Sequence, residues 1–136
     1  MRKNPAYLYT ILLSLIIISF VTCKKDKCPA GEGGNLTLKL KTIHHNNYIY
    51  GCLVKIKFGT QDFPGATGAF DLTKQAGAHD STITFSGLKC GDYYIYGTGV
   101  DSSLTSTDKS VSGGIPYSTT KDDGVVELTL PVTEDH

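Results

Sequence analysis

Two strands joined by a glycine-containing corner, within residues 82–101, constrain the fold of this chain most strongly. Their sequence is TITFSGLKCGDYYIYGTGVD, in which Ile83 and Phe85 alternate with threonines. Apolar residues at every second position are typical of a strand with one buried face. Gly87 and Gly91 follow at the corner, where a positive φ angle is cheap only for glycine. The pair predicts a β-fold.

The same alternation recurs along the rest of the chain. Residues 36–41, 52–58 and 126–132 each place apolar side chains at every second position. Residues 111–117 contain two glycines and a proline, which restricts that segment to an edge strand or an irregular one. We expect no helix beyond the leader. Five clear strands and two weaker ones predict an all-β domain, a single seven-stranded Greek-key β-sandwich over residues 36–133 with a tail at 134–136.

The corner also carries a resemblance to known folds. Leu88, Gly91 and Tyr93 form an L-x-x-G-x-Y pattern. It resembles the start of the penultimate strand in immunoglobulin-like and transthyretin-like sandwiches, which include the carboxypeptidase regulatory-type domains. The resemblance implies that the tyrosine turns inward and that its hydroxyl bonds to backbone upstream. A likeness of this kind supports a fold better than a function.

Two orientations of the strand at residues 93–100 compete. One buries Tyr93 and Ile95 and places glycines where the strand meets the facing sheet; the other buries Tyr94, Tyr96 and the alternate residues after them. The corner motif favours the first, because its tyrosine must turn inward. We therefore predict Tyr94 and Tyr96 on the outer face, spaced as a stacking platform for a ligand.

A leader at residues 1–22 precedes the domain. Arg2 and Lys3 are followed by an apolar run over residues 6–21, too short for a spanning helix and typical of a signal-peptide core. Cys23 comes next, and the order resembles the lipobox of bacterial lipoproteins.

The lipobox resemblance is to its looser, Bacteroidota-type form. Phe20 and Thr22 stand where the commonest form has leucine and a small residue. The resemblance implies that Cys23 is the acylated first residue of the mature protein. An uncleaved membrane anchor and an ordinary secretory peptide are the alternatives, and the absence of a small-x-small cleavage site disfavours the second.

The residues after Cys23 indicate where in the cell the protein is located. Lys24, Lys25 and Asp26 resemble the surface-export signal of Bacteroidota lipoproteins, and residues 23–35 read as a flexible glycine-rich tether. The run IKFGTQDFPG resembles a group of small lipoproteins of that kind. These resemblances imply an outer-membrane lipoprotein displayed at the cell surface.

Charge and motifs limit the function classes. Removing Arg2 and Lys3 with the leader leaves 11 basic and 13 acidic residues, a formal charge of −2. This argues against a nucleic-acid partner, which needs a basic face. No catalytic motif is present, so we expect no catalytic residue, no cofactor and no metal. The expected partners are the membrane, through the lipid, and a protein or glycan ligand.

The histidine residues indicate an alternative function for the chain. An envelope hydrolase or a metal-binding protein would use His44, His45 and His79. Against a shared ion, neighbouring residues of a strand point to opposite faces, which separates His44 from His45. A non-catalytic binding or structural module is therefore the preferred reading.

Three cysteines follow Cys23, so one internal disulfide leaves one thiol free. Envelope compartments permit disulfides. Cys52 opens one predicted strand and Cys90 precedes the penultimate one. If these two strands run in the same direction, both cysteines lie at one end of the sandwich. We therefore predict a Cys52–Cys90 disulfide.

Overall fold

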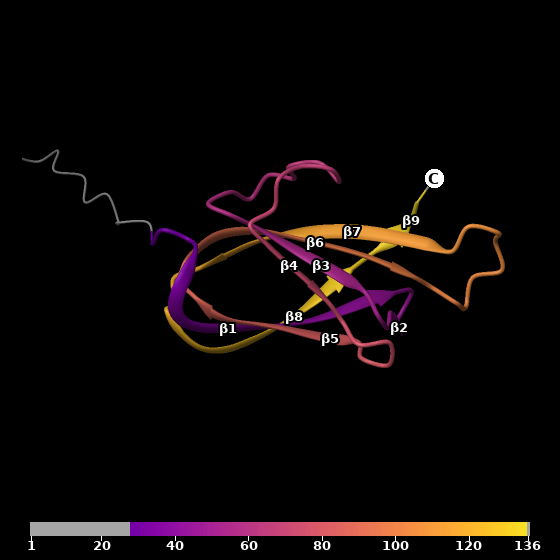
Figure 1. The fold of residues 1–136 in the computed structure, drawn as a ribbon, viewed down its shortest axis with the longest axis horizontal. Helices are drawn as coiled ribbons and strands as arrows, with labels where there is room; N and C mark the ends of the chain where they lie inside the picture. Colours follow the sequence, from indigo (N-terminus) through magenta and orange to yellow (C-terminus); the bar gives the residue numbers. More distant parts are fainter. Residues whose placement is uncertain (1–27, 136) are drawn as a thin grey trace, which may run out of the picture.

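The computed structural model describes residues 28–135, which form β-strands, turns and loops without a helix in that range (Figure 1). Its strands are β1 (Glu32–His44), β2 (Asn47–Tyr48), β3 (Leu53–Phe58), β4 (Leu72–Gln75), β5 (Thr82–Leu88), β6 (Gly91–Val100), β7 (Ser110–Thr119), β8 (Asp123–Pro131) and β9 (Thr133–Glu134). The prediction of an all-β domain is confirmed. Its strands form two sheets, compatible with a β-sandwich, but the described residues contain nine strands against the seven predicted.

The first sheet is built around β1. This strand pairs antiparallel with β5 and with the short β2, and parallel with β8 along its other edge. Its inward residues are Leu36, Leu38, Leu40, Thr42 and His44, all buried. β1 is therefore longer than the predicted strand at both ends, because β5 and β8 supply backbone partners beyond the apolar run.

The second sheet has the order β4-β3-β6-β7-β9. β6 pairs with β7 along its whole length, including the two glycines and Pro116. Pro116 is tolerated because β9 pairs only with Val111 and Ser112, which leaves the rest of β7 as a sheet edge. The predicted tail begins one residue too early, since Glu134 belongs to β9.

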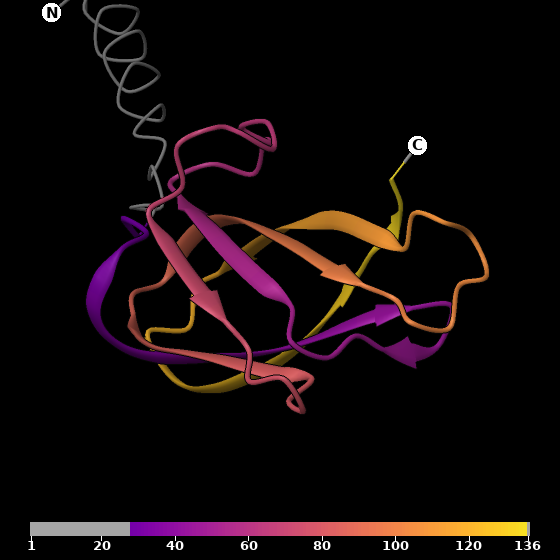
Figure 2. The same cartoon turned by 45° about the vertical axis from the view of Figure 1, so that its right-hand side comes forward.

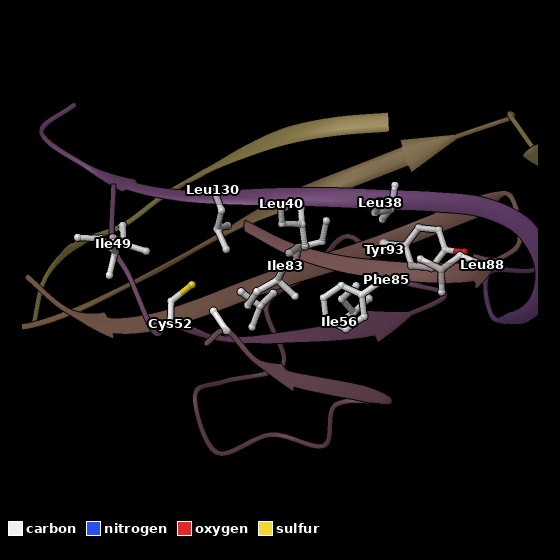
Figure 3. Close-up of a cluster of buried hydrophobic side chains, with 14 of the residues drawn as sticks. Leu38, Leu40, Ile49, Cys52, Ile56, Ile83, Phe85, Leu88, Tyr93 and Leu130 are labelled. Atoms are coloured by element: carbon white, nitrogen blue, oxygen red, sulfur yellow. The ribbon is translucent and has the colours of Figure 1, made fainter. Parts of the chain in front are cut away.

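The core lies between the two sheets (Figure 3). Leu38, Leu40 and Leu130 project from the first sheet toward Ile56 and Tyr93 of the second. The glycines predicted to allow close approach do so. A Cβ at Gly97 would lie 2.6 Å from Leu130 Cδ2, and one at Gly99 would lie 2.6 Å from Ile49 Cγ2.

β1 runs along the long axis of the domain, from the start of the described chain to a tight turn at the opposite end (Figures 1 and 2). His45 and Asn46 form this turn with φ angles of 46° and 70°. Both angles lie in the left-handed region, as a two-residue hairpin turn requires. The end of the described chain, at β9, lies toward the same side as this turn.

Candidate functional site

A disulfide closes the end of the domain where the described chain begins. Cys28 is bonded to Cys90 with a Cα–Cα distance of 5.3 Å, whereas Cys52 is a free, buried thiol. The predicted Cys52–Cys90 bond is therefore wrong. The partner of Cys90 is instead Cys28, which was predicted to lie in the flexible tether.

The prediction assumed that the strands after Cys52 and Cys90 run in the same direction, but they run in opposite directions. β3 and β6 are antiparallel neighbours, with Leu53 opposite Thr98. Cys52 therefore lies near the end of β6, while Cys90 precedes its start. The nine or so intervening strand residues span roughly 30 Å, far beyond disulfide reach. Figure 3 shows Cys52 and Leu88 at opposite ends of the core.

Glycines let the first described residues pack onto the corner before β6. A Cβ at Gly34 would lie 2.1 Å from the carbonyl oxygen of Leu88, and one at Gly91 would lie 2.5 Å from the Ala30 nitrogen. Lys89 N–H donates to the Gly31 carbonyl at 2.9 Å. Residues 28–35 are thus part of the folded domain, and the predicted tether is wrong for that range.

Tyr93 locks the same corner. Its ring is fully buried, its hydroxyl donates to the Lys89 carbonyl, and Gly31 N–H donates to the hydroxyl oxygen at 3.4 Å. Burial raises the pKa of the Tyr93 hydroxyl, which keeps it protonated as a donor. The inward orientation of Tyr93 and the buried position of Ile95 are confirmed.

The outer face of β6 carries an aromatic cluster of Tyr94, Tyr96, Phe63 and Phe70. The Phe63 ring centroid lies 5.4 Å from that of Tyr94 and 5.0 Å from that of Tyr96, and Phe70 lies 6.0 Å from Tyr96. Tyr96 is only 7% exposed, whereas Phe63 is 48% exposed. The two tyrosines do lie on the outer face, but the expected open platform is wrong because the β3–β4 loop covers it.

At the other end of the domain, His44 pairs with Asp101. The His44 Nδ1 lies 2.7 Å from Asp101 Oδ2, and both side chains are buried. Ser103 donates two hydrogen bonds to Asp101 Oδ1, from its backbone N–H at 2.9 Å and its hydroxyl at 2.6 Å. The bond from the Ser103 hydroxyl, then the His44 contact and the Ser103 N–H bond, lower the pKa of Asp101 to about 2. Asp101 is therefore an acceptor at neutral pH, and Nδ1 of His44 carries the donated proton.

His45 and Glu134 join His44 around an open surface pocket. We call it the distal pocket; its lining residues are His44, His45, Val132, Thr133 and Glu134. One ligand atom from each of His44, His45 and Glu134 lies within 4.8 Å of the others. The expectation that the two histidines diverge is wrong, since His45 lies in the turn rather than in a strand and its ring centroid is 4.2 Å from that of His44.

Some predicted site residues lie apart from these groups. His79 is exposed in the turn between β4 and β5 and does not belong to the histidine–glutamate group. Cys23, Lys24, Lys25 and Asp26 fall outside the described residues. The described part of the chain contains no helix with the length and hydrophobicity that crossing a membrane requires.

Several residues of these sites were missed in the sequence, and three of them show why. Asp101, Glu134 and Phe63 each occupy a loop or a strand end, where no period of hydrophobicity marks a partner. For Cys28 a signal did exist. The glycines on both sides of its disulfide, in CPAGEGG and KCGD, indicate two backbones that approach closely.

Comparison of the chain with family models, with curated proteins and with solved structures finds no match.

Proposed function

We propose that this chain is a lipid-anchored, non-catalytic module of the cell envelope, with a transthyretin-like sandwich that binds a protein or glycan at the outer-membrane surface. Cys23 carries the lipid, and Lys24, Lys25 and Asp26 direct export. The formal charge of −2 after removal of the leader gives no support for a nucleic-acid partner.

The Cys28–Cys90 disulfide is the observation that carries this proposal. Disulfides persist in oxidising compartments and are rare in the cytosol, which agrees with export. Cys28 comes five positions after Cys23, and a fully extended chain of that length spans at most about 17 Å. The corner would then lie close to the membrane and the distal pocket would point away from it.

The exposed ring of Phe63 is the surface we assign to the partner. The rings of Tyr94 and Tyr96 lie against it, with centroid distances of 5.4 Å and 5.0 Å. A rigid aromatic side chain offers a large contact area at a small entropic cost. Phe63, and not Tyr94 or Tyr96, is therefore the contact residue of the proposed site.

Mass spectrometry of the membrane fraction tests the anchor. We expect an N-terminal peptide that begins with acylated Cys23, and Cys23→Ala should leave the chain unacylated. An intact leader or an unmodified Cys23 in the wild type would contradict the proposal.

Protease treatment of intact cells tests surface display. Added protease should remove the wild-type domain, and the triple variant Lys24→Ala, Lys25→Ala, Asp26→Ala should be protected. Equal protection of both forms would contradict export to the surface.

Crosslinking on intact cells tests the binding surface. Phe63→Ala should lose a crosslinked partner that the wild type retains. Tyr48→Ala, which removes another exposed aromatic ring of 52% exposure, is the matched control and should retain it. Loss in both variants, or in neither, would exclude Phe63 as the contact.

A further inference from the structure

The distal pocket brings together two imidazoles and a carboxylate from separate parts of the fold. His44 ends β1, His45 lies in the following turn, and Glu134 ends β9. Within the described residues, this is the group of histidine, cysteine and acidic side chains whose spacing suits a metal ion. Two nitrogens and one carboxylate oxygen are a ligand set that Zn²⁺ takes when a further coordination position stays open.

We propose that the distal pocket binds one Zn²⁺ ion through His44, His45 and Glu134. The proposal goes beyond the envelope function above and does not depend on it. Imidazole suits zinc and other borderline transition metals, whereas calcium and magnesium prefer sets made of oxygen alone.

The Asp101 contact prepares His44 for this role. Because Nδ1 donates to Asp101 Oδ2 at 2.7 Å, the lone pair of the neutral ring lies on Nε2, the nitrogen left for the pocket that His44 lines. A carboxylate behind a ligating histidine is the usual arrangement in metal sites, where it sets both the tautomer and the ring orientation. The two bonds from Ser103 hold Asp101 in turn. Asp101 is thus a positioning residue.

The ligand atoms of His44, His45 and Glu134 need to move only slightly closer together to bind zinc. Zinc bonds of about 2.1 Å in a tetrahedron place the ligand atoms about 3.4 Å apart. The present separations reach no more than 4.8 Å. His45 is exposed in a turn, so its side chain can rotate toward the ion while the buried His44 stays in place. The open pocket leaves a fourth position for water or for a group of a partner.

Zinc bound here would join the two sheets. His44 belongs to the first sheet and Glu134 to the second, and each is the last residue of its strand. An ion that binds only the folded chain stabilises it by mass action. Zinc should therefore raise the unfolding temperature.

Zinc content tests the proposal directly. The full-length chain, purified in detergent and stripped with a chelator, is dialysed against micromolar Zn²⁺ and assayed for metal. We expect one ion per chain in the wild type, and none in His45→Ala or Glu134→Gln. His45 is exposed and Glu134 is partly exposed, so these variants should fold. His79→Ala and Cys52→Ala are the matched controls for a remote histidine and for the free thiol, and each should keep one ion.

Two further measurements distinguish a specific zinc site from nonspecific binding of the ion. Co²⁺ in place of zinc should give the intense visible absorption of a four-coordinate ion, and zinc should raise the unfolding temperature of the wild type but not of His45→Ala. Asp101→Asn should weaken zinc binding about 10–100-fold, as loss of a partner behind a ligand does, while circular dichroism stays unchanged.

Three results would overturn the inference: no stoichiometric zinc in the wild type, equal binding by His45→Ala and Glu134→Gln, or the weak Co²⁺ spectrum of a hydrated ion. Unchanged zinc affinity in Asp101→Asn would overturn the positioning role of that residue.

Discussion

Tyr93 shows how one side chain can join three segments. Its ring fills the core, while its hydroxyl receives a bond from Gly31 and donates one to Lys89. The segment before β1, the corner and β6 therefore meet at a single phenol. Tyr94, its neighbour, faces outward and is half-buried, so adjacent tyrosines differ sharply in their role.

Substitution of Tyr93 should separate the ring from the hydroxyl. Tyr93→Phe keeps the ring and should cost about 1–2 kcal/mol through the lost hydrogen bonds. Tyr93→Ala should cost about 3–5 kcal/mol, because it also empties core volume. Urea denaturation measures both, with Tyr94→Ala as the control. A larger loss in Tyr94→Ala than in Tyr93→Ala would contradict the orientation of β6.

The Asp101 carboxylate should make the free energy of unfolding fall at low pH. Its pKa of about 2 in the folded chain lies below the ordinary value, so its contribution is complete above about pH 4 and is lost as the pH falls toward 2. The free energy of unfolding of the metal-free wild type should fall by about 1–2 kcal/mol more than that of Asp101→Asn over this interval. Chemical denaturation in chelator at several pH values measures the difference. Parallel curves for the two proteins would contradict the assignment.

At the scale of elements, β1 links the two ends of the domain. It begins beside the disulfide and ends at the distal pocket, with β5 on one edge and β8 on the other. The parallel β1–β8 pair places the end of β8 beside the end of β1, with Pro131 opposite Ile43. This pairing is why Glu134 lies next to His45.

Loss of the disulfide should loosen the start of β1. The bond joins residues 62 positions apart, and a loop of that size corresponds to about 4 kcal/mol in the chain-entropy account. Cys28→Ser should therefore lower the free energy of unfolding by up to that amount, and a reductant should do the same to the wild type. Cys52→Ala should keep its sensitivity to reductant. A non-reducing peptide map that pairs Cys52 with Cys90 would contradict the structure.

At the scale of the whole molecule, one core serves both sheets. Buried side chains of β1, β5 and β8 form a single cluster with those of β3, β6 and β7. Neither sheet has an apolar interior of its own, so neither sheet should stay folded after the other unfolds.

Unfolding should therefore be a single cooperative transition. Far-ultraviolet circular dichroism reports the strands, and tyrosine fluorescence reports the tertiary environment of the tyrosines, including the buried Tyr93. Because both depend on the same cluster, their denaturation curves should coincide. Two separated midpoints in the oxidised protein would contradict a shared core.

The sequence by itself determined the local order of this protein. Alternation placed the strands around Leu38, Val54 and Phe85, and the corner motif correctly oriented Tyr93. These are properties of a few consecutive residues, since the side chains of a strand alternate between its two faces. Strand edges and short strands such as β2 and β9 were missed, because they depend on a backbone partner and not on hydrophobicity.

Only the tertiary structure decided which distant residues meet. The Cys28–Cys90 bond depends on the start of β1 lying beside the end of β5, with Glu32 opposite Leu88, and local sequence does not record that pairing. The distal pocket depends on the parallel return of β8 beside β1, which carries Glu134 to the histidine turn. Each site joins segments separated by 60 residues or more, so its geometry follows from strand order and direction. The identity of its residues alone could not supply it.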